Sequence, residues 1–290
     1  MSGSEHLRLA LLSEVFHGEG AAERLATWLD RARTLSVQLV VLPELALDPW
    51  IPATRELRDE DAELADGPRR RMVRAAAREF GVAVLGSAIV RDPSTGQRYN
   101  QAFLVDGTGA ERGRYSKLHI PQEPGFWETD HYAPGPETFS LMGLHGVPLG
   151  IQICSDINRP QGTHILAARG ARLVLHPRAT ESDSFDHWRL VMRATARTAT
   201  VWIASVNRPR PEQGVSLGGP SVVVDPTGEV VAEGYQTLMH WDIDTSRNEE
   251  ASRTYPGYLG VRSDVYANAW NETLPREMVP PLHEDRDDDE

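Results

Sequence analysis

The sequence predicts an α/β fold, and two observations support this class. Apolar runs typical of strands alternate with amphipathic helical stretches in the first half of the chain, and the same order returns in the second half. Each half then ends in strands joined by tight turns. The chain has 290 residues, of which 40% are hydrophobic, so it can bury a large core. Because no low-complexity linker separates the halves, we expect one domain.

The first half carries the signals of several strands and two helices. The strands are expected at residues 7–15, 38–43, 82–90, 99–106 and 110–117, and the helices at residues 20–35 and 68–80. Leu25 and Leu29 share one face of the first helix. Pro68 suits the first turn of the second helix, and Gly81 follows its end.

The second half repeats this order and adds a hairpin. The strands are expected at residues 147–153, 172–176, 201–206, 221–224 and 229–232, and the helices at residues 161–169 and 185–198. Gly170 stands where the first of these helices should end. Asp225-Pro226-Thr227-Gly228 is a turn sequence between the last two strands. Periodicity alone does not distinguish two stacked sheets from one doubly wound sheet.

Three chemically reactive side chains each stand at the end of a predicted strand. Cys154, the single cysteine, follows the run at residues 147–153, and Glu44 and Lys117 end two strands of the first half. In α/β folds, the carboxyl ends of the strands form the rim where ligand chemistry takes place. A thiol is a good nucleophile only as the thiolate, which needs a nearby base or cation. The sequence therefore predicts a cysteine hydrolase of amide or nitrile bonds.

Each of these residues also has a plainer interpretation. A free cysteine is often a small buried core residue, a glutamate can simply end a strand, and a lysine can be a solvated surface group. The pair Ser155-Asp156 argues against a core role for Cys154, because it breaks the apolar run directly after the cysteine. Glu44 follows a run that contains no other charge.

Longer motifs around these residues sharpen the prediction. Leu42-Pro43-Glu44, residues 115–121 (Tyr-Ser-Lys-Leu-His-Ile-Pro) and residues 150–156 (Gly-Ile-Gln-Ile-Cys-Ser-Asp) resemble the three signatures of the carbon–nitrogen hydrolase (nitrilase) superfamily, in the family's order. The resemblance continues through Val206-Asn207-Arg208 and Asp225-Pro226-Thr227-Gly228-Glu229, so it covers nearly the whole chain. It implies the four-layer α-β-β-α sandwich of the nitrilase type.

The resemblance also implies a role for each reactive residue. Glu44 corresponds to the family's general base and Cys154 to the nucleophile that forms a thioester. Lys117 corresponds to the cation that stabilises the oxyanion, together with the backbone N–H of Ser155. Glu128 takes the place of a second glutamate that orients the lysine and the substrate. The expected reaction cleaves a non-peptide C–N bond and releases ammonia or an amine.

The residues next to the catalytic candidates indicate the substrate class. Trp127, Ser155 and Asp156 are expected substrate contacts. Family members that cleave nitriles tend to carry Trp-Glu after the nucleophile, whereas Ser155-Asp156 is closer to amidases and N-carbamoyl amidases. Residues 120–128 are most similar to N-carbamoylputrescine amidases. The expected substrate is a small amide or ureido compound; a nitrilase, an acyltransferase and a catalytically silent member of the fold remain as alternatives.

The loop at residues 177–186 is expected to form a wall of the pocket, because it should leave the sheet at the rim of Cys154. Its acids, Glu181 among them, could bind a cationic amine, whereas Arg178 could bind a carboxylate. The family's amino-acid carbamoylases carry paired arginines after the cysteine, and these are missing here. A neutral or amine-bearing substrate is therefore favoured; the alternative is a solvated loop that caps the following helix.

No cofactor and no metal are expected. The ten histidines are scattered without metal-ligand spacing, and the chain has no phosphate-binding or dinucleotide-binding loop. A Cys–His dyad of the protease type is the rival mechanism. No histidine is singled out by a motif, and His119, within the lysine signature, is expected to be structural.

Composition limits the partners and the compartment. The formal net charge of −12 argues against nucleic-acid binding. No apolar run approaches the roughly 18 residues of a membrane span, and the first residues lack a signal-peptide pattern. We expect no membrane contact and a cytoplasmic protein with a reduced thiol.

The C-terminal part of the chain is expected to be an extension and a tail. Residues 1–275 should form one carbon–nitrogen hydrolase domain with an extension from about residue 246, and residues 276–290 an acidic, disordered tail. Exposed aromatic residues in an extension favour burial against a partner subunit, so a homodimer or larger homo-oligomer is expected. The alternative is packing on their own domain. These residues are Tyr255, Tyr258, Tyr266 and Trp270.

Overall fold

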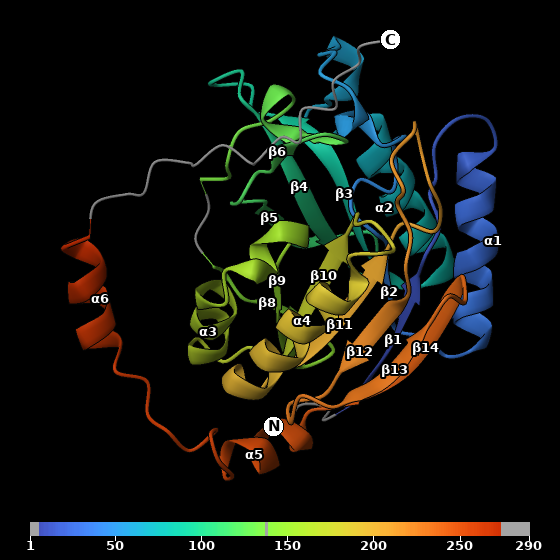
Figure 1. Cartoon of the computed structure of the whole chain (residues 1–290). Helices are drawn as coiled ribbons and strands as arrows, with labels where there is room; N and C mark the ends of the chain where they lie inside the picture. Colours follow the sequence, from blue (N-terminus) through green and yellow to red (C-terminus); the bar gives the residue numbers. More distant parts are fainter. Residues whose placement is uncertain (1–5, 137–138, 274–290) are drawn as a thin grey trace.

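Two six-stranded β-sheets lie face to face at the centre of the structure, and helices cover their outer sides (Figure 1). The computed structural model describes residues 6–136 and 139–273 of the chain. The first sheet has the strand order β14-β1-β2-β3-β4-β5, and the second has the order β13-β12-β11-β10-β9-β8. This is the predicted four-layer α-β-β-α sandwich.

The strands have the following bounds. Those of the first sheet are β1 (His6–Leu12), β2 (Leu39–Val41), β3 (Ala83–Arg91), β4 (Arg98–Val105), β5 (Glu111–Ser116) and β14 (Leu238–Asp244). Those of the second sheet are β8 (Met142–Leu144), β9 (Val147–Ile151), β10 (Leu173–Arg178), β11 (Trp202–Asn207), β12 (Ser221–Val224) and β13 (Val230–Gly234).

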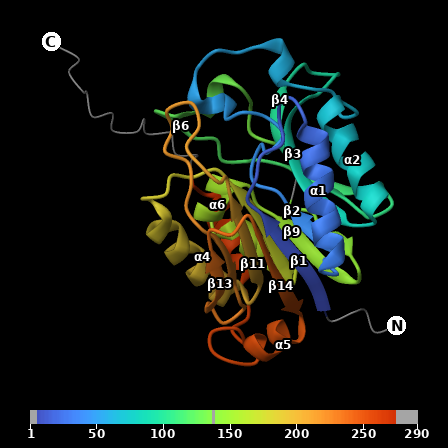
Figure 2. The same cartoon turned by 90° about the vertical axis from the view of Figure 1, so that its right-hand side faces the viewer.

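The helices pack against the outer faces of the sheets through buried apolar side chains. Helices α1 (Ala21–Thr34) and α2 (Pro68–Phe80) share a core cluster with the first sheet, and α3 (Gln161–Ala168) and α4 (Phe185–Ala199) share one with the second sheet. Figure 2 shows α1 and α2 on one side of the strands and α4 on the other.

The alternation of side chains along a strand explains why each sheet is buried on both faces. Leu9 and Leu11 of β1 point into the core between the sheets, whereas Ala10 and Leu12 point into the core beneath α1 and α2. From Leu9 to Leu12 both faces of β1 are buried, and this accounts for the continuous apolar sequence of these four residues.

Helix α2 begins and ends where its sequence predicts. Pro68 opens the helix, and Gly81 follows its end with a left-handed φ of 68°, a conformation that glycine adopts without strain. The buried carboxylate of Glu63 accepts hydrogen bonds from the backbone N–H groups of Arg69 and Arg70 in the first turn. These bonds satisfy donors that have no partner within the helix.

Strand directions bring the ends of several strands to one rim. Strands β1, β2 and β3 run parallel, as do β9, β10 and β11. Strand β5 is antiparallel to β4, which is itself antiparallel to β3, so β5 ends at the same edge as β2 and β3. The segments after β2, β5 and β9 therefore leave the sheets at one rim, as predicted.

The structure corrects the predicted elements in a few places. The strand predicted at residues 172–176 is wrong at its end, because Pro177 and Arg178 still pair with β11 and extend β10. Strands β8 and β14 lie outside the predicted set, as does the small sheet of β6 (Gln122–Glu123) and β7 (Phe126–Trp127). Strands β6, β7 and β8 have only two or three residues and carry too little periodicity to be recognised.

Short 3-10 helices occupy several loops. They are Ile51–Ala53, Asp59–Asp61, Glu128–Asp130 and Cys154–Asn158. Two of them begin at residues that the sequence singled out, Glu128 and Cys154. Cys154 thus starts a helical turn three residues after the last residue of β9, Ile151.

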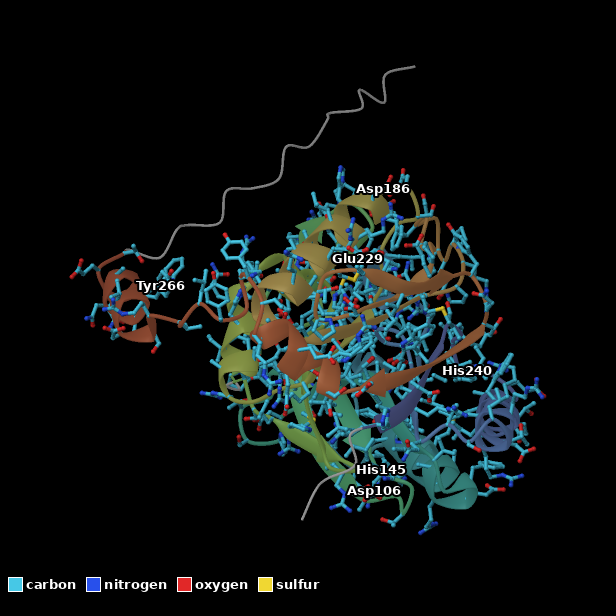
Figure 3. The ribbon with its side chains drawn as sticks, turned by 90° about the horizontal axis from the view of Figure 1, so that it is seen from below. Asp106, His145, Asp186, Glu229, His240 and Tyr266 are labelled. Carbon is cyan, nitrogen blue, oxygen red and sulfur yellow. The ribbon has the colours of Figure 1, made fainter. Side chains whose placement is uncertain are left out.

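Two short helices follow the last strand. Helix α5 (Ser246–Ser252) packs near the ends of the strands, whereas α6 (Ser263–Asn271) stands apart from the body in Figures 1 and 3. None of the residues of α6 is buried. The tail predicted at residues 276–290 lies outside the described residues. Within the described ranges, no helix is both long and apolar enough to cross a membrane.

Candidate active site

Three charged side chains from three loops meet in the interior at the rim. The ammonium Nζ of Lys117 lies 2.8 Å from Oε1 of Glu44 and 2.5 Å from Oε2 of Glu128. All three side chains are fully buried. Lys117 follows β5, Glu44 follows β2, and Glu128 begins the 3-10 helix after β7. Residues that are far apart in sequence thus form one compact charged cluster.

Two neutral side chains each add one hydrogen bond to the carboxylates. The amide Nδ2 of Asn100 donates to Oε1 of Glu44 at 2.7 Å, and the hydroxyl of Tyr132 donates to Oε2 of Glu128 at 2.5 Å. The second oxygen of each carboxylate, Oε2 of Glu44 and Oε1 of Glu128, is buried without a protein partner within the described residues. Each of these oxygens can accept a hydrogen bond from a reactant.

The charges in this cluster support one another. Burial alone would lower the pKa of Lys117, but the negative charges of Glu128 and Glu44 outweigh burial and raise it, so the ammonium stays protonated. Burial raises the pKa of Glu128 to about 7, although the positive charge of Lys117 opposes this shift. The cluster therefore presents a fixed cation and an acid that titrates near neutral pH.

Cys154 lies beside this cluster in a constrained turn. Its φ of 49° is in the left-handed region, which is unusual for a residue with a side chain. Its sulfur lies 3.6 Å from the carbonyl oxygen of Ala179. Burial and the nearby charge of Glu44 raise the pKa of the thiol, while Lys117 opposes this shift. The thiol is therefore protonated at neutral pH, and a base must remove its proton before it can attack.

Asp156 ties the turn of Cys154 to the lysine segment. This fully buried carboxylate accepts hydrogen bonds from the backbone N–H groups of Ile153, Leu118 and His119, at 3.2, 3.2 and 2.9 Å. It also accepts one from the hydroxyl of Tyr115 at 2.9 Å. Because these donors come from β5 and the segment after it and from the segment after β9, Asp156 fixes the segment after Lys117 against the turn that carries Cys154.

Arg208 holds the loop of Glu44 in a similar way. Its buried guanidinium donates to the carbonyl oxygens of Glu44, Leu45 and Asp48, at 3.0, 2.8 and 2.9 Å. It also forms an ion pair with Glu212 at 2.7 Å. Since Arg208 follows β11 of the second sheet, the loop after β2 of the first sheet is anchored across the sandwich.

A cavity of about 210 Å³ opens beside the cluster. Cys154, Ser155 and Glu181 line it, and Glu128 contributes to its wall. The other lining residues are Pro121, Glu123, Phe126, Asn158, Ala179, Thr180, Ser184 and Trp188. The cavity is large enough for a small organic molecule and contains two further carboxylates, those of Glu123 and Glu181.

The predicted substrate contacts fall into two groups. Ser155 and Glu181 line the cavity. Trp127, Asp156 and Arg178 are not among its lining residues: Trp127 packs under the guanidinium of Arg55 at 3.8 Å, and Asp156 and Arg178 are fully buried among protein partners.

Sequence reasoning missed Asn100, Tyr132 and His176. Tyr132 stands four residues after Glu128, one helical turn away, and this spacing is the signal that could have found it. His176 ends the apolar run Leu173-Val174-Leu175, where a polar side chain must find a buried partner. Its Nε2 lies 2.9 Å from the carbonyl oxygen of Cys154. That contact is to the backbone and not to the sulfur, so the geometry does not form a Cys–His dyad.

Superposition on solved structures identifies the class of fold to which this protein belongs. A carbon–nitrogen hydrolase from Helicobacter pylori G27 superposes with a TM-score of 0.78 at 22% identity, covering 91% of this chain and 98% of that chain. An amidase from Nesterenkonia sp. superposes with a TM-score of 0.75 at 25% identity, covering 93% and 98%. The fold is that of the nitrilase superfamily.

The sequence comparison then gives the family. The family model described as carbon-nitrogen hydrolase matches residues 15–246. The chain belongs to this family. It is 30% identical to omega-amidase NIT2 of Bos taurus over 79% of this chain and 84% of the relative, and 28% identical to N-carbamoylputrescine amidase of Arabidopsis thaliana over 90% and 92%. Both relatives, by their names, are amidases. The protein is thus a carbon–nitrogen hydrolase related to amidases.

The described residues offer no obvious place for a metal. No group of three or more His, Cys, Asp or Glu side chains in residues 6–136 and 139–273 is arranged to hold an ion. The charged cluster contains its own cation, Lys117, in the position where a metal would otherwise neutralise two carboxylates.

Proposed function

We propose that the protein hydrolyses the C–N bond of a small amide or N-carbamoyl (ureido) compound through a thioester on Cys154. One observation carries this proposal: Lys117 is held between Glu44 and Glu128 beside a cavity that also contains the Cys154 thiol. Glu44 and Lys117 do not line the cavity, but the charges of both act on the Cys154 thiol, which does. The proposal therefore groups a nucleophile, a base and a cation at the inner end of the cavity.

In the first step, Cys154 attacks the carbonyl carbon. Glu44 takes the thiol proton, because its Oε2 has no other partner among the described residues. The carbonyl π electrons move to oxygen, and the resulting oxyanion accepts hydrogen bonds from Nζ of Lys117 and from the backbone N–H of Ser155. Proton removal and attack occur together, because the raised pKa of the thiol disfavours a free thiolate.

In the second step, the tetrahedral intermediate collapses. The oxyanion electrons re-form the carbonyl group, the C–N bond breaks, and Glu44 gives its proton to the leaving nitrogen, which departs as ammonia or an amine. Water then attacks the thioester while Glu44 accepts its proton. The new intermediate collapses to a carboxylic or carbamic acid, the C–S bond breaks, and Glu44 returns the proton to the departing thiolate. Glu44 therefore acts as base, acid and base in turn, and the last proton transfer to sulfur restores both groups.

Glu128 has a different role in this mechanism. It remains bonded to Lys117 at 2.5 Å and to Tyr132, and it keeps the ammonium charged and aimed at the oxyanion site. A single carboxylate would leave Lys117 free to rotate, whereas two carboxylates define its direction. Glu128 is proposed as the residue that orients the lysine and meets the substrate through its cavity-facing side.

The acids of the cavity support a cationic or neutral substrate. Glu123 and Glu181 line the cavity, and no arginine or lysine is among its lining residues. Burial and the charges of Asp183 and Glu123 raise the pKa of Glu181, which shows that these acids are close enough to repel one another. A substrate ammonium group would relieve this repulsion, whereas a substrate carboxylate would add to it. An amine-bearing amide or ureido compound fits best.

Replacing Glu181 with glutamine is expected to raise KM for a cationic amide by up to about tenfold. Glu181 lines the cavity but is only half-buried, so solvent screens part of the about 2–5 kcal/mol that a fully buried ion pair in a binding site is worth. KM for a neutral amide of similar size should stay within about twofold, since the amide keeps the shape of the side chain. Steady-state kinetics with the two substrates measures the difference. Asp186→Asn is the matched control, because Asp186 is 88% exposed at the start of α4 (Figure 3) and does not line the cavity.

Arg159 stands close to the position of the paired arginines of the amino-acid carbamoylases, a few residues after Cys154. An N-carbamoyl α-amino acid as best substrate, with its binding destroyed by Arg159→Ala or Arg178→Ala, would show this preference to be wrong. The screen that decides the reaction measures ammonia release from amides, ureido compounds and nitriles. Hydroxylamine added to the same assays distinguishes an acyltransferase, because it would capture the acyl group as a hydroxamate.

We further propose that the chain forms a homodimer or larger homo-oligomer through its C-terminal extension. Helix α6 exposes Val265, Tyr266 and Trp270, of which the last two are each 60% exposed. Figure 3 shows Tyr266 away from the body of the protein. Large apolar side chains gathered on a projecting helix are typical of a subunit interface.

Light scattering at micromolar concentration should therefore give a mass that is a multiple of the chain mass. The double variant Tyr266→Ser/Trp270→Ser should shift this mass towards that of one chain, because it removes the apolar anchors of the interface. Tyr235→Ser is the control, since Tyr235 is 77% exposed but does not belong to α6. A parent protein that is monomeric throughout this range would end the proposal.

The cytoplasm is the location we propose. The mechanism requires a reduced thiol, and a reducing compartment keeps a cysteine in that form. Fractionation of cells that produce the protein tests this point.

A further inference from the structure

A chain of buried hydrogen bonds leads from strand β10 to the nucleophile turn. Nε of Arg178 lies 3.0 Å from the hydroxyl oxygen of Ser205, and this oxygen lies 2.9 Å from Nδ1 of His176. Nε2 of His176 lies 2.9 Å from the carbonyl oxygen of Cys154. Arg178, Ser205 and His176 are each 0% exposed. None of them is needed as a base, acid or nucleophile in the mechanism proposed above.

The chemistry of the end groups fixes the direction of every bond in this chain. A guanidinium can only donate, so the Ser205 oxygen accepts from Arg178 and gives its own proton to Nδ1 of His176. A carbonyl oxygen can only accept, so Nε2 of His176 carries the ring proton and donates it to Cys154. Burial lowers the pKa of His176 to about 3, so the ring is neutral and this tautomer is consistent.

This series of hydrogen bonds begins at a buried positive charge, that of Arg178, which has no carboxylate partner. Besides Ser205, the guanidinium of Arg178 donates to the hydroxyl of Thr180 and to the carbonyl oxygen of Pro220, both neutral groups. None of the ion pairs within the described ranges includes Arg178. Burial lowers its pKa to about 10, and it therefore remains charged at neutral pH. A buried cation with only neutral partners exerts its field on the groups around it.

The last acceptor in this series of hydrogen bonds is the carbonyl oxygen of Cys154, which belongs to the peptide group between Cys154 and Ser155. The carbonyl group of Cys154 and the N–H of Ser155 are two ends of one peptide unit. When the oxygen of a peptide accepts a hydrogen bond, its N–H becomes more positive and a stronger donor. The Ser155 N–H is the group that the proposed mechanism assigns to the oxyanion.

We propose that Arg178, Ser205 and His176 form a polarising relay that strengthens the Ser155 N–H as an oxyanion donor. The inference rests on the proposed function, because it concerns the oxyanion of that reaction. All four bonds point the same way, from the cation through Ser205, His176 and the peptide to the oxyanion. The three residues are positioning residues, since they act through the peptide and do not touch the substrate.

The relay acts on the transition state more than on the bound substrate. Charge on the carbonyl oxygen is small in the amide and large in the tetrahedral intermediate, so a stronger donor lowers the barrier and leaves ground-state binding nearly unchanged. Alkylation of the thiol by iodoacetamide forms no oxyanion. A weakened relay should therefore slow hydrolysis and leave alkylation unaffected.

The test compares Ser205→Ala, Ser205→Thr and His176→Phe with the parent. We expect kcat to fall roughly tenfold in Ser205→Ala and roughly 100-fold in His176→Phe, with KM within about twofold, because removal of a full oxyanion donor costs about 10²–10³. Ser205→Thr keeps the hydroxyl and should recover most of the loss. An aldehyde analogue of the best amide substrate, which forms an oxyanion on Cys154, should lose affinity in parallel with kcat.

The control variant is Ser221→Ala. Ser221 is also a buried serine of the second sheet, but its hydroxyl has no hydrogen-bond partner among the described residues, so its loss should leave kcat unchanged. Circular dichroism establishes that each variant is folded. If His176→Phe is unfolded, the comparison of Ser205→Ala with Ser205→Thr carries the test alone.

Two results would overturn the relay. Unchanged kcat in Ser205→Ala would show that polarisation of the peptide contributes nothing. Alkylation that slows by the same factor as hydrolysis would show that the residues only hold the thiol in place. Both results are distinct from failure of the proposed function, which would appear as hydrolysis that survives the loss of Cys154.

Discussion

Replacing Cys154 with alanine is expected to lower kcat for amide hydrolysis by more than roughly 10³-fold, because no other group in the cavity can form the thioester. The fold should persist, since loss of one sulfur atom beside an existing cavity leaves only a small void. Turnover is measured as ammonia release, and folding by the thermal unfolding midpoint.

Iodoacetamide provides the companion experiment. It should inactivate the parent protein by modifying one site, because the chain has a single cysteine. Substrate present during alkylation should slow the inactivation by occupying the same cavity. Hydrolysis by Cys154→Ala within tenfold of the parent rate would rule out the thiol mechanism.

Replacing Lys117 with methionine is expected to abolish turnover and to destabilise the fold by about 3–5 kcal/mol, the usual cost of removing one partner from a buried ion pair. The variant leaves Glu44 and Glu128 buried with no cation between them. Urea unfolding at neutral pH measures the loss.

The destabilisation should depend on pH in a defined direction. Burial raises the pKa of Glu128 to about 7 even with Lys117 present, above the value of about 4.3 expected for an unfolded glutamate. Without Lys117 the pKa of Glu128 rises further. The folded variant therefore binds more protons than the unfolded chain at pH values above about 4.3, and its stability rises as the pH falls from neutral towards that value. The double variant Lys117→Met/Glu128→Gln should regain part of the lost stability at neutral pH. Equal stability of Lys117→Met and the parent would contradict the buried cluster.

The sequence predicted the elements with strong periodicity and the residues with distinctive chemistry. Strand β1 and helix α2 are long enough for their patterns to be read, and the parallel direction of the central strands places their ends at one rim. For this reason the sequence alone predicted that Glu44, Lys117 and Cys154 lie close together. Strand β14 was missed although it carried a usable signal, because His240, Asp242 and Asp244 alternate with Trp241 and Ile243 in the period-two pattern of a half-buried strand.

The limits of sequence reasoning are clearest for Asp156 and Arg178. Both were expected to meet the substrate, because a polar residue next to the nucleophile or after a strand commonly faces the pocket. In the structure Asp156 accepts hydrogen bonds from backbone N–H groups in the segments that follow β5 and β9, and Arg178, the last residue of β10, is fully buried. Whether a polar side chain turns outward or inward depends on partners contributed by distant segments, such as Ser205, and a local pattern does not contain that information.

The pairing of β1 with β14 has a consequence for how the protein is made. Strand β1 finds one neighbour in β2 soon after synthesis, but its other edge stays unpaired until β14, far along the chain, has been made. During that interval the edge of β1 is open to pairing with another nascent chain. Synthesis of β14 closes that edge, so protection from aggregation arrives with β14 rather than with the pairing of β1 and β2.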